Sequence, residues 1–136
     1  INNFVNIVID LLEEQQKSFT SDLVYSIEKT ISWEKLDNTA KINLYRILQE
    51  SLQNCNKYAN AKTVTVSFLE TEGNIVMKIE DDGIGFDITK KKKGIGLKNM
   101  ISRTEESKGT YEIISEIGKG TITTVSLPLI TPTQIA

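Results

Sequence analysis

Four side chains that can bind a metal ion, a phosphate or a nucleobase recur at helical spacing within residues 44–59, namely Glu50, Asn54, Lys57 and Tyr58. Residues four, seven and eight positions apart stack on adjacent turns of an α-helix, so we expect all four along one border of its apolar stripe. The amide oxygen of Asn54 suits Mg²⁺, which prefers oxygen ligands. Glu50, one turn earlier, can orient a metal-bound water or accept a proton.

The other two members of this row suit a nucleotide. Lys57 offers a positive charge to a phosphate, and Tyr58 offers a flat ring on which a base can stack. The alternative interpretation is a solvated helix border with an ordinary Glu-to-Lys interaction. The helix alone does not decide between these two hypotheses.

A carboxylate stands at the start of the sequence DDGIGF, residues 81–86. Asp81 has the same strand parity as Met77 and Ile79, so its side chain is predicted to point toward the covered side of a sheet. A buried carboxylate is costly without hydrogen-bond donors. Turn amides are one source of such donors, and an amino-bearing ring such as adenine is the other. Asp82 is interpreted as a solvated turn acid.

The glycines after Asp81 favour the ligand hypothesis. Gly83 and Gly85 let the chain pass close to a flat ligand, and Ile84 can press against it. Thr121 shares the parity of Val125 and Leu127 in the last predicted strand and is therefore also expected to face inward.

A second glycine pair, in GIGL at residues 94–97, comes directly before a predicted helix. Gly94 and Gly96 free backbone amides at a helix start, where anions bind well. The lysine run ending at Lys93 can help to neutralise a triphosphate. A flexible loop and a solvated charge run are the alternatives for these two features.

The composition narrows the function further. The chain has 136 residues, which fits one domain, and a formal net charge of −2, which argues against a nucleic-acid binder or a membrane-surface binder. No apolar run approaches the ~20 residues of a membrane helix, and no secretory signal is visible. A single cysteine fits a reducing compartment, so we expect a cytoplasmic location. The first residue is Ile1, which suggests a piece of a longer protein, and a membrane anchor in that parent protein stays open.

The chain contains no histidine. This absence removes the usual general base, the usual zinc ligand and any Ser-His or Cys-His pair. Chemistry must therefore rest on carboxylates, amides, lysines or a metal that a ligand brings.

Hydrophobic periodicity and turn residues divide the chain into alternating helices and strands. The predicted helices are 3–17, 37–60 and 97–107, and the predicted strands are 21–28, 62–68, 74–81, 110–116 and 121–129. Two hairpins, at 72–74 and 117–120, make part of the sheet antiparallel. These elements indicate a mixed sheet with helices packed on one side.

Four motifs in order give the chain a family resemblance. LYRILQESLQNCNKYA resembles the N box, DDGIGF the first glycine box, GIGL the second and GKGT the last box of the ATP-binding catalytic domain of bacterial sensor histidine kinases. That domain has the Bergerat fold, which type II topoisomerases, Hsp90 and MutL share. The short region between the glycine boxes, without a phenylalanine box, is most similar to the nitrate- and nitrite-sensor subfamily.

The resemblance implies ATP and Mg²⁺ as ligands and a role for each matched residue. Asn54 would coordinate Mg²⁺, with Glu50 beside it. Lys57 would approach the phosphates and Tyr58 the adenine, although many relatives have histidine at that position. Asp81 would accept from the adenine amino group, directly and through a water shared with Thr121. The residues that would shape the pocket and its lid are Gly83, Ile84, Gly85, Lys93, Gly94, Ile95, Gly96 and Leu97, the lid being about 87–95.

The implied fold is a two-layer α/β sandwich, with a mixed and largely antiparallel sheet of about five strands and about three helices on one face. The ATP-binding domain would span residues 1–128, followed by a loose C-terminal tail at 129–136.

The implied function is transfer of the γ-phosphoryl of Mg-ATP to a histidine on a separate dimerisation domain, which then serves a response regulator. Because this chain has no histidine, the phosphoacceptor must lie elsewhere in the parent protein. Two alternatives stay open, namely a module that binds ATP without productive transfer and a serine kinase of the anti-sigma-factor type. No nucleic-acid contact and no membrane contact are expected of this segment.

Overall fold

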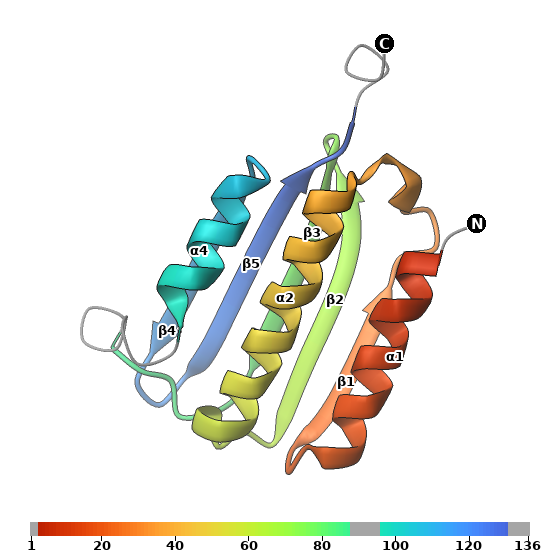
Figure 1. Cartoon of the computed structure of the whole chain (residues 1–136). Coiled ribbons are helices and arrows are strands. Elements are labelled where there is room, and N and C mark those ends of the chain that lie inside the picture. Colours follow the sequence, from red (N-terminus) through yellow and green to blue (C-terminus); the bar gives the residue numbers. More distant parts are fainter. Residues whose placement is uncertain (1–2, 88–95, 131–136) are drawn as a thin grey trace.

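The computed structural model describes residues 3–87 and 96–130. Figure 1 shows a sheet with helices lying across one face of it. In chain order the elements are α1 (Asn3–Ser18), β1 (Asp22–Ile27), a 3₁₀ turn (Trp33–Lys35), α2 (Asn38–Asn54), a π-helical turn (Cys55–Ala59), β2 (Thr63–Thr71), β3 (Asn74–Asp81), α4 (Leu97–Glu106), β4 (Thr110–Glu116) and β5 (Gly120–Pro128).

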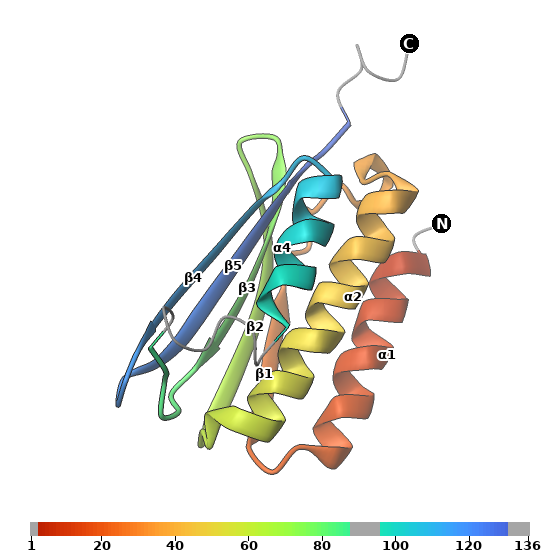
Figure 2. The ribbon, with the colours of Figure 1, turned by 60° about the vertical axis from the view of Figure 1, so that its left-hand side comes forward.

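The five strands form one sheet in the order β1-β2-β3-β5-β4. β1 and β2 are parallel, and the other three pairs are antiparallel. Figure 2, turned by 60°, shows α1, α2 and α4 side by side in one layer and the sheet as the second layer. The predicted two-layer α/β sandwich is therefore confirmed.

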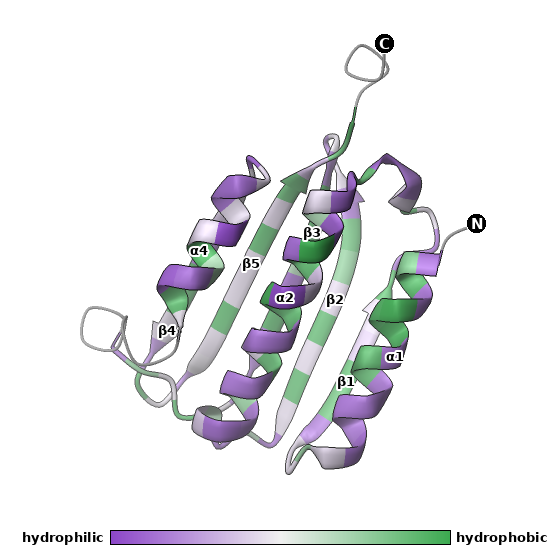
Figure 3. Cartoon of the chain, in the orientation of Figure 1, coloured by the Kyte–Doolittle hydropathy of each residue, from purple (hydrophilic) through white to green (hydrophobic). Residues whose placement is uncertain are grey.

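The core lies between the two layers. Val64, Val66 and Phe68 of β2 and Met77 and Ile79 of β3 are all at most 2% exposed, as their strand parity predicts. Figure 3 shows this alternation of hydrophobic and hydrophilic residues along the strands, and polar residues on the outer sides of the helices. Burial of this one-sided apolar surface is what holds helices and sheet together.

The β2–β3 hairpin fixes the register that positions the predicted site. Its turn residues Glu72 and Gly73 have φ of 52° and 78°, the left-handed conformations of a tight two-residue turn. In the resulting register Asp81, the last residue of β3, pairs with Val64 on one side and with Thr121 on the other. A slip by one residue would turn the Asp81 side chain to the open face of the sheet.

Helix α2 has a defined start and an irregular end. The Asp37 carboxylate caps it by accepting from the backbone N–H of Ala40 at 2.8 Å. The π-helical turn widens its last five residues, and Asn60 ends it with a φ of 48°. The predicted continuous helix over 37–60 is therefore an α-helix followed by one wider turn, a feature often found at functional sites.

The last described residues continue the fold beyond β5. Leu129 is buried and donates its N–H to Gly73, and Ile130 donates to Lys35. Residues 131–136 lie outside the described chain. Within the described chain, no helix has both the length and the apolar character needed to cross a bilayer.

Candidate functional site

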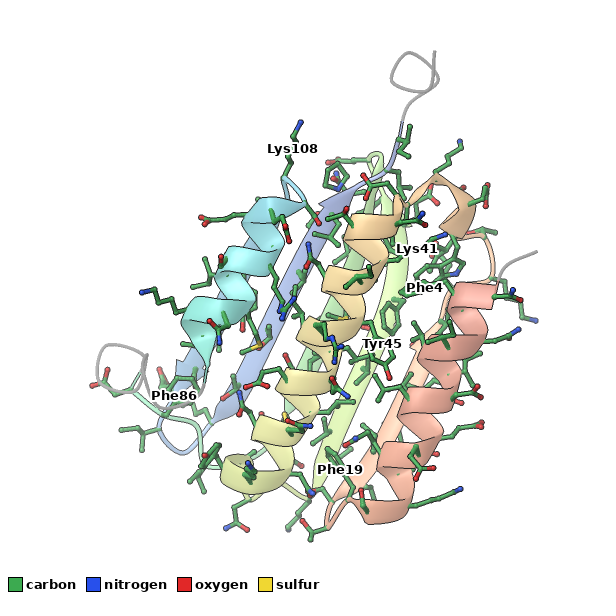
Figure 4. All side chains as sticks on the ribbon, viewed as in Figure 1. Phe4, Phe19, Lys41, Tyr45, Phe86 and Lys108 are labelled. Atoms are coloured by element: carbon green, nitrogen blue, oxygen red, sulfur yellow. The ribbon has the colours of Figure 1, made fainter. Side chains whose placement is uncertain are left out.

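A cavity of about 390 Å³ lies between α2, α4 and the sheet, at the end where β3 finishes and α4 begins. This volume is within the range of small-molecule sites, roughly 300–1,000 Å³. Figure 4 shows Phe86 at the same end of α4, with Lys108 at the other. The cavity is lined by Ser51, Asn54, Cys55, Tyr58, Ala59, Ile79, Asp81, Ile84, Gly85, Phe86, Leu97, Met100, Tyr111, Ile113, Thr121 and Thr123.

Asp81 is the charged residue among the described residues that line the cavity. Its side chain points inward and is 7% exposed, as its strand parity predicts. Oδ1 accepts from the backbone N–H of Gly83 at 2.8 Å. Burial raises the pKa of the Asp81 carboxyl, the N–H of Gly83 opposes that shift, and the charge of Asp82 adds to it. The site thus holds a hydrogen-bond acceptor whose ionised form is poorly solvated.

The second oxygen of Asp81 faces a weak donor. Cys55 Sγ lies 3.9 Å from Oδ2. Burial, followed by the negative charge of Asp81, raises the pKa of the Cys55 thiol to about 12, so the thiol stays protonated. Because a thiol is a weak donor and a carboxylate oxygen accepts more than one hydrogen bond, Oδ2 retains acceptor capacity toward the cavity. Cys55 was not among the site residues predicted from the sequence.

Gly83 and Gly85, the first glycine pair, let the loop after β3 lie directly against two other backbone segments. A Cβ on Gly83 would lie 2.0 Å from the carbonyl oxygen of Ala59, and one on Gly85 would lie 2.0 Å from that of Glu116. Ile84, between them, donates its N–H to Ala59 at 2.8 Å and accepts from Gly118 at 2.6 Å. The close approach in this structure is to the protein's own backbone, which the spacing of the glycines does not reveal.

Asp82 does more than the solvated turn acid that the sequence predicted. It is exposed, but its Oδ1 accepts from the backbone N–H groups of Lys62 at 2.8 Å and Thr63 at 3.0 Å. The hydrogen bond from Thr63 holds the pKa of the Asp82 carboxyl below its usual range. Asp82 therefore caps the start of β2, while its neighbour Asp81 faces the cavity.

The four polar residues predicted to share one helix border lie on α2 and on the π-helical turn after it, and only two of them line the cavity. Asn54 and Tyr58 line the cavity as far as the described chain bounds it, whereas Glu50 and Lys57 do not. Lys57 is exposed. Glu50 lies beside the start of α4. If Gly96 carried a side chain, its Cβ atom would be 2.7 Å from Glu50 Oε1.

The remaining predicted residues lie in or beside the cavity, or outside the described chain. Ile84, Gly85, Leu97 and Thr121 line it. Gly96, with a φ of 71°, is the N-cap of α4. Lys93, Gly94 and Ile95 fall outside the described residues, as does most of the predicted lid.

Several residues that line the cavity were missed in the sequence. Ile79 and Thr123 share strand parity with Asp81 and Thr121, a signal that could have identified them. Met100 lies about one helical turn after Leu97. Its sulfur accepts from Ser51 Oγ at 3.3 Å.

Tyr111, from the edge strand β4, was missed as well. Its hydroxyl lies 3.8 Å from the sulfur of Met100. Burial raises the pKa of Tyr111 to about 12, so its hydroxyl remains a donor. Its position depends on the pairing of β4 with β5.

A model of the family described as "Histidine kinase-, DNA gyrase B-, and HSP90-like ATPase" matches residues 39–131, which contain the cavity. The chain belongs to this family. The matched residues run from α2 to beyond β5, and the prediction of an ATP-binding domain of the sensor histidine kinase type is confirmed.

Two curated relatives of this ATPase-family domain are sensor kinases. The oxygen sensor histidine kinase NreB of Staphylococcus carnosus (strain TM300) is 39% identical over 100 residues, which cover 72% of this chain and 29% of that protein. The sensor protein VraS of Staphylococcus aureus (strain COL) is 31% identical over 121 residues, covering 88% of this chain and 34% of that protein. The chain thus spans about a third of the length of these relatives.

Solved structures share the fold of this domain. The blue-light activated histidine kinase of Erythrobacter litoralis EL346 superposes with a TM-score of 0.74 at 15% identity, covering 93% of this chain and 42% of that one. The histidine kinase AdeS of Acinetobacter baumannii gives a TM-score of 0.67 at 21% identity, covering 96% of this chain and 65% of that one. At these identities the likeness supports the fold alone.

Proposed function

We propose that this domain binds Mg-ATP and transfers its γ-phosphoryl to a histidine on a separate dimerisation domain of the parent protein. The phosphorylated dimerisation domain would then act on a response regulator. The observation that carries the proposal is the pairing, in one cavity, of a buried acceptor at Asp81 with the amide of Asn54 on α2. The first suits an adenine and the second suits a metal bound to phosphates. The family of the chain supports ATP as the ligand.

The apolar end of the cavity fits a purine ring. Ile79, Ile84 and Met100 line it and would contact the faces of the ring. The free acceptor capacity of Asp81 Oδ2 would receive a hydrogen from the 6-amino group. Because that acceptor is buried, a ring without a donor there would leave it unsatisfied, which costs about 1–3 kcal/mol.

The phosphates would lie beside the α2 wall of the cavity, which Asn54 lines. Asn54 would hold Mg²⁺, which usually keeps several waters and uses few protein ligands together with substrate phosphates. Among residues 3–87 and 96–130 there is no cluster of three acidic, histidine or cysteine side chains that could hold a metal alone. Mg²⁺, when bound, would neutralise charge on the phosphates.

Glu50 and Lys57 would act from outside the described cavity. Glu50, which lies beside Gly96, would orient a water near Asn54 or hold the start of α4. Lys57 is exposed and would reach the phosphates by its flexible side chain. Gly94, Gly96 and Lys93 complete the proposed phosphate contacts.

The test is phosphoryl transfer from γ-labelled ATP, measured with this chain alone and with the dimerisation domain of the parent added. We expect acid-labile label on the added domain only, because this chain contains no histidine. Asn54→Ala should abolish transfer. Gln53→Ala, an exposed change on the same helix, is the matched control and should transfer normally.

Three results would contradict the proposal. Acid-labile label on the isolated chain would place the acceptor within it. Acid-stable label on a partner would indicate a serine kinase. ATP binding without transfer to the parent's dimerisation domain would indicate a nucleotide-binding module.

A further inference from the structure

Ser115 joins two walls of the cavity without lining the cavity itself. It lies on the edge strand β4, directly opposite Thr121 of β5. Its Oγ is 2.7 Å from Thr121 Oγ1, accepts from the backbone N–H of Phe86 at 2.9 Å, and donates to the carbonyl of Gly120 at 3.2 Å. Phe86 and Thr121 both line the cavity. One hydroxyl therefore connects the loop after Asp81 with β5.

The number of protons in this group limits how the two hydroxyls can point. Ser115 has one proton and two lone pairs. If Ser115 donates to Gly120, its lone pairs accept from Phe86 and from Thr121, and three hydrogen bonds form. If Ser115 donates to Thr121 instead, Gly120 loses its bond, only two bonds form at Ser115, and the Thr121 proton turns away from Ser115. The first arrangement is favoured because each hydrogen bond contributes to stability.

The favoured arrangement has a consequence for the cavity. The proton of Thr121 is used in the bond to Ser115, so Thr121 Oγ1 presents only lone pairs to a ligand. Asp81 pairs with Thr121 across β3 and β5, which brings a carboxylate and this hydroxyl oxygen side by side. The polar end of the base site then consists of two neighbouring acceptors.

We propose that Ser115 is a positioning residue that sets nucleobase specificity by fixing the hydroxyl of Thr121 as an acceptor. The inference rests on the proposed ATP site. Two acceptors suit the two hydrogens of a 6-amino group, as in adenine, and disfavour a 6-oxo group, as in hypoxanthine. Without Ser115 the Thr121 proton is free to rotate toward the cavity and donate to a 6-oxo group.

The experiment compares, by calorimetric titration, the affinities of ATP and inosine triphosphate, whose bases differ in the 6-amino or 6-oxo group and in the hydrogen that hypoxanthine carries on N1. Ser115→Ala should reduce the preference for ATP by about 3- to 10-fold, the value of one hydrogen bond. Ser115→Thr keeps the hydroxyl on a residue that suits a strand, and it should retain the preference. If Ser115→Ala does not fold, Ser115→Cys replaces it, since a thiol is a poor substitute in this network.

Repeating the substitution of Ser115 in a variant without the Thr121 hydroxyl shows whether Ser115 acts through Thr121. In Thr121→Val, which has no hydroxyl to orient, adding Ser115→Ala should leave the ratio of affinities unchanged. A parallel loss of both affinities with a lowered melting temperature would mean that Ser115 is only structural, and it would overturn the inference. If the wild-type chain bound neither nucleotide, both the proposed ATP site and this inference would be wrong. If it bound ATP, but the ratio of ATP to inosine triphosphate affinity did not depend on Ser115, only this inference would be wrong.

Discussion

Replacing Asp81 with asparagine tests the assignment of the base site, because it changes one atom and little of the shape. The amide oxygen of the new side chain can keep the 2.8 Å hydrogen bond from Gly83 that Oδ1 now accepts. Its amide nitrogen then takes the place of Oδ2 and points toward Cys55 and the cavity. A donor thus replaces the acceptor that would receive the 6-amino group of adenine.

The size of the effect follows from burial. Asp81 is 7% exposed and lines the cavity, so a bound purine would keep water from replacing the lost partner, whereas water can fill the cavity of the free protein. An unsatisfied buried donor costs about 1–3 kcal/mol. At about 1.4 kcal/mol for each factor of ten, the affinity for ATP should fall by roughly 5- to 150-fold.

The same substitution should not harm the fold. Burial raises the pKa of Asp81, so the folded state binds that proton more tightly than the unfolded state, where the pKa is about 3.9. The stability that this carboxyl contributes is therefore present at low pH and lost as the pH rises through its folded pKa. Asp81→Asn should remove this loss and be at least as stable as the wild type at neutral pH.

The assay is titration of ATP by calorimetry, with thermal unfolding as the check on folding. Asp82→Asn is the matched control, since it makes the same change one residue later on an exposed side chain and keeps an oxygen for Lys62 and Thr63. It should leave ATP affinity unchanged. A folded Asp81→Asn variant with wild-type affinity would refute the base site.

Three further predictions concern the neighbours of Asp81. Iodoacetamide at pH 8 should alkylate Cys55 at least about a hundredfold more slowly in the folded than in the unfolded chain, because the thiolate is the nucleophile and the thiol pKa is about 12; mass spectrometry measures the rates, and equal rates would contradict a protonated thiol. Gly83→Ala should cost about 3 kcal/mol in the free energy of unfolding, because its Cβ would lie 2.0 Å from the Ala59 carbonyl oxygen; a neutral result in urea denaturation would show that the loop moves freely. Gly120→Ala should destabilise more than Gly73→Ala, since both glycines have positive φ but only Gly120 has a backbone atom, the carbonyl oxygen of Asp81, 2.2 Å from the added Cβ; equal losses in thermal unfolding would mean that β3 and β5 are not held together there.

Much of the fold could be predicted because the central strands β2, β3 and β5 each have one buried face. The period of two in Ile75, Met77 and Ile79 predicts which way Asp81 points, and the hairpin at Glu72 and Gly73 fixes its register. Helix α4 ends at Glu106, within one residue of the end predicted at 107. These are local signals, and the structure follows them.

The parts of the site that depend on contacts between distant segments could not be predicted in this way. Gly83 is required by the carbonyl of Ala59, and Gly85 by that of Glu116, neither of which is near in sequence. Ser115 shows no motif, and its importance arises only from the pairing of β4 with β5. Helical spacing also groups Glu50 with Asn54, although Glu50 packs against Gly96 while Asn54 lines the cavity.

Asp81 and Asp82 are two adjacent residues of the same type whose surroundings and pKa shifts differ because of the fold. Asp81 and Asp82 follow each other in the chain, and strand geometry sends them to opposite sides. Burial raises the pKa of Asp81, whereas the N–H of Thr63 lowers that of Asp82. Asp82 therefore contributes stability that is lost as the pH falls, and Asp81 contributes stability that is lost as the pH rises. Asp81, whose charged form does not stabilise the fold, is the acid that points into the cavity. A ligand with hydrogen-bond donors would supply partners for its oxygens there.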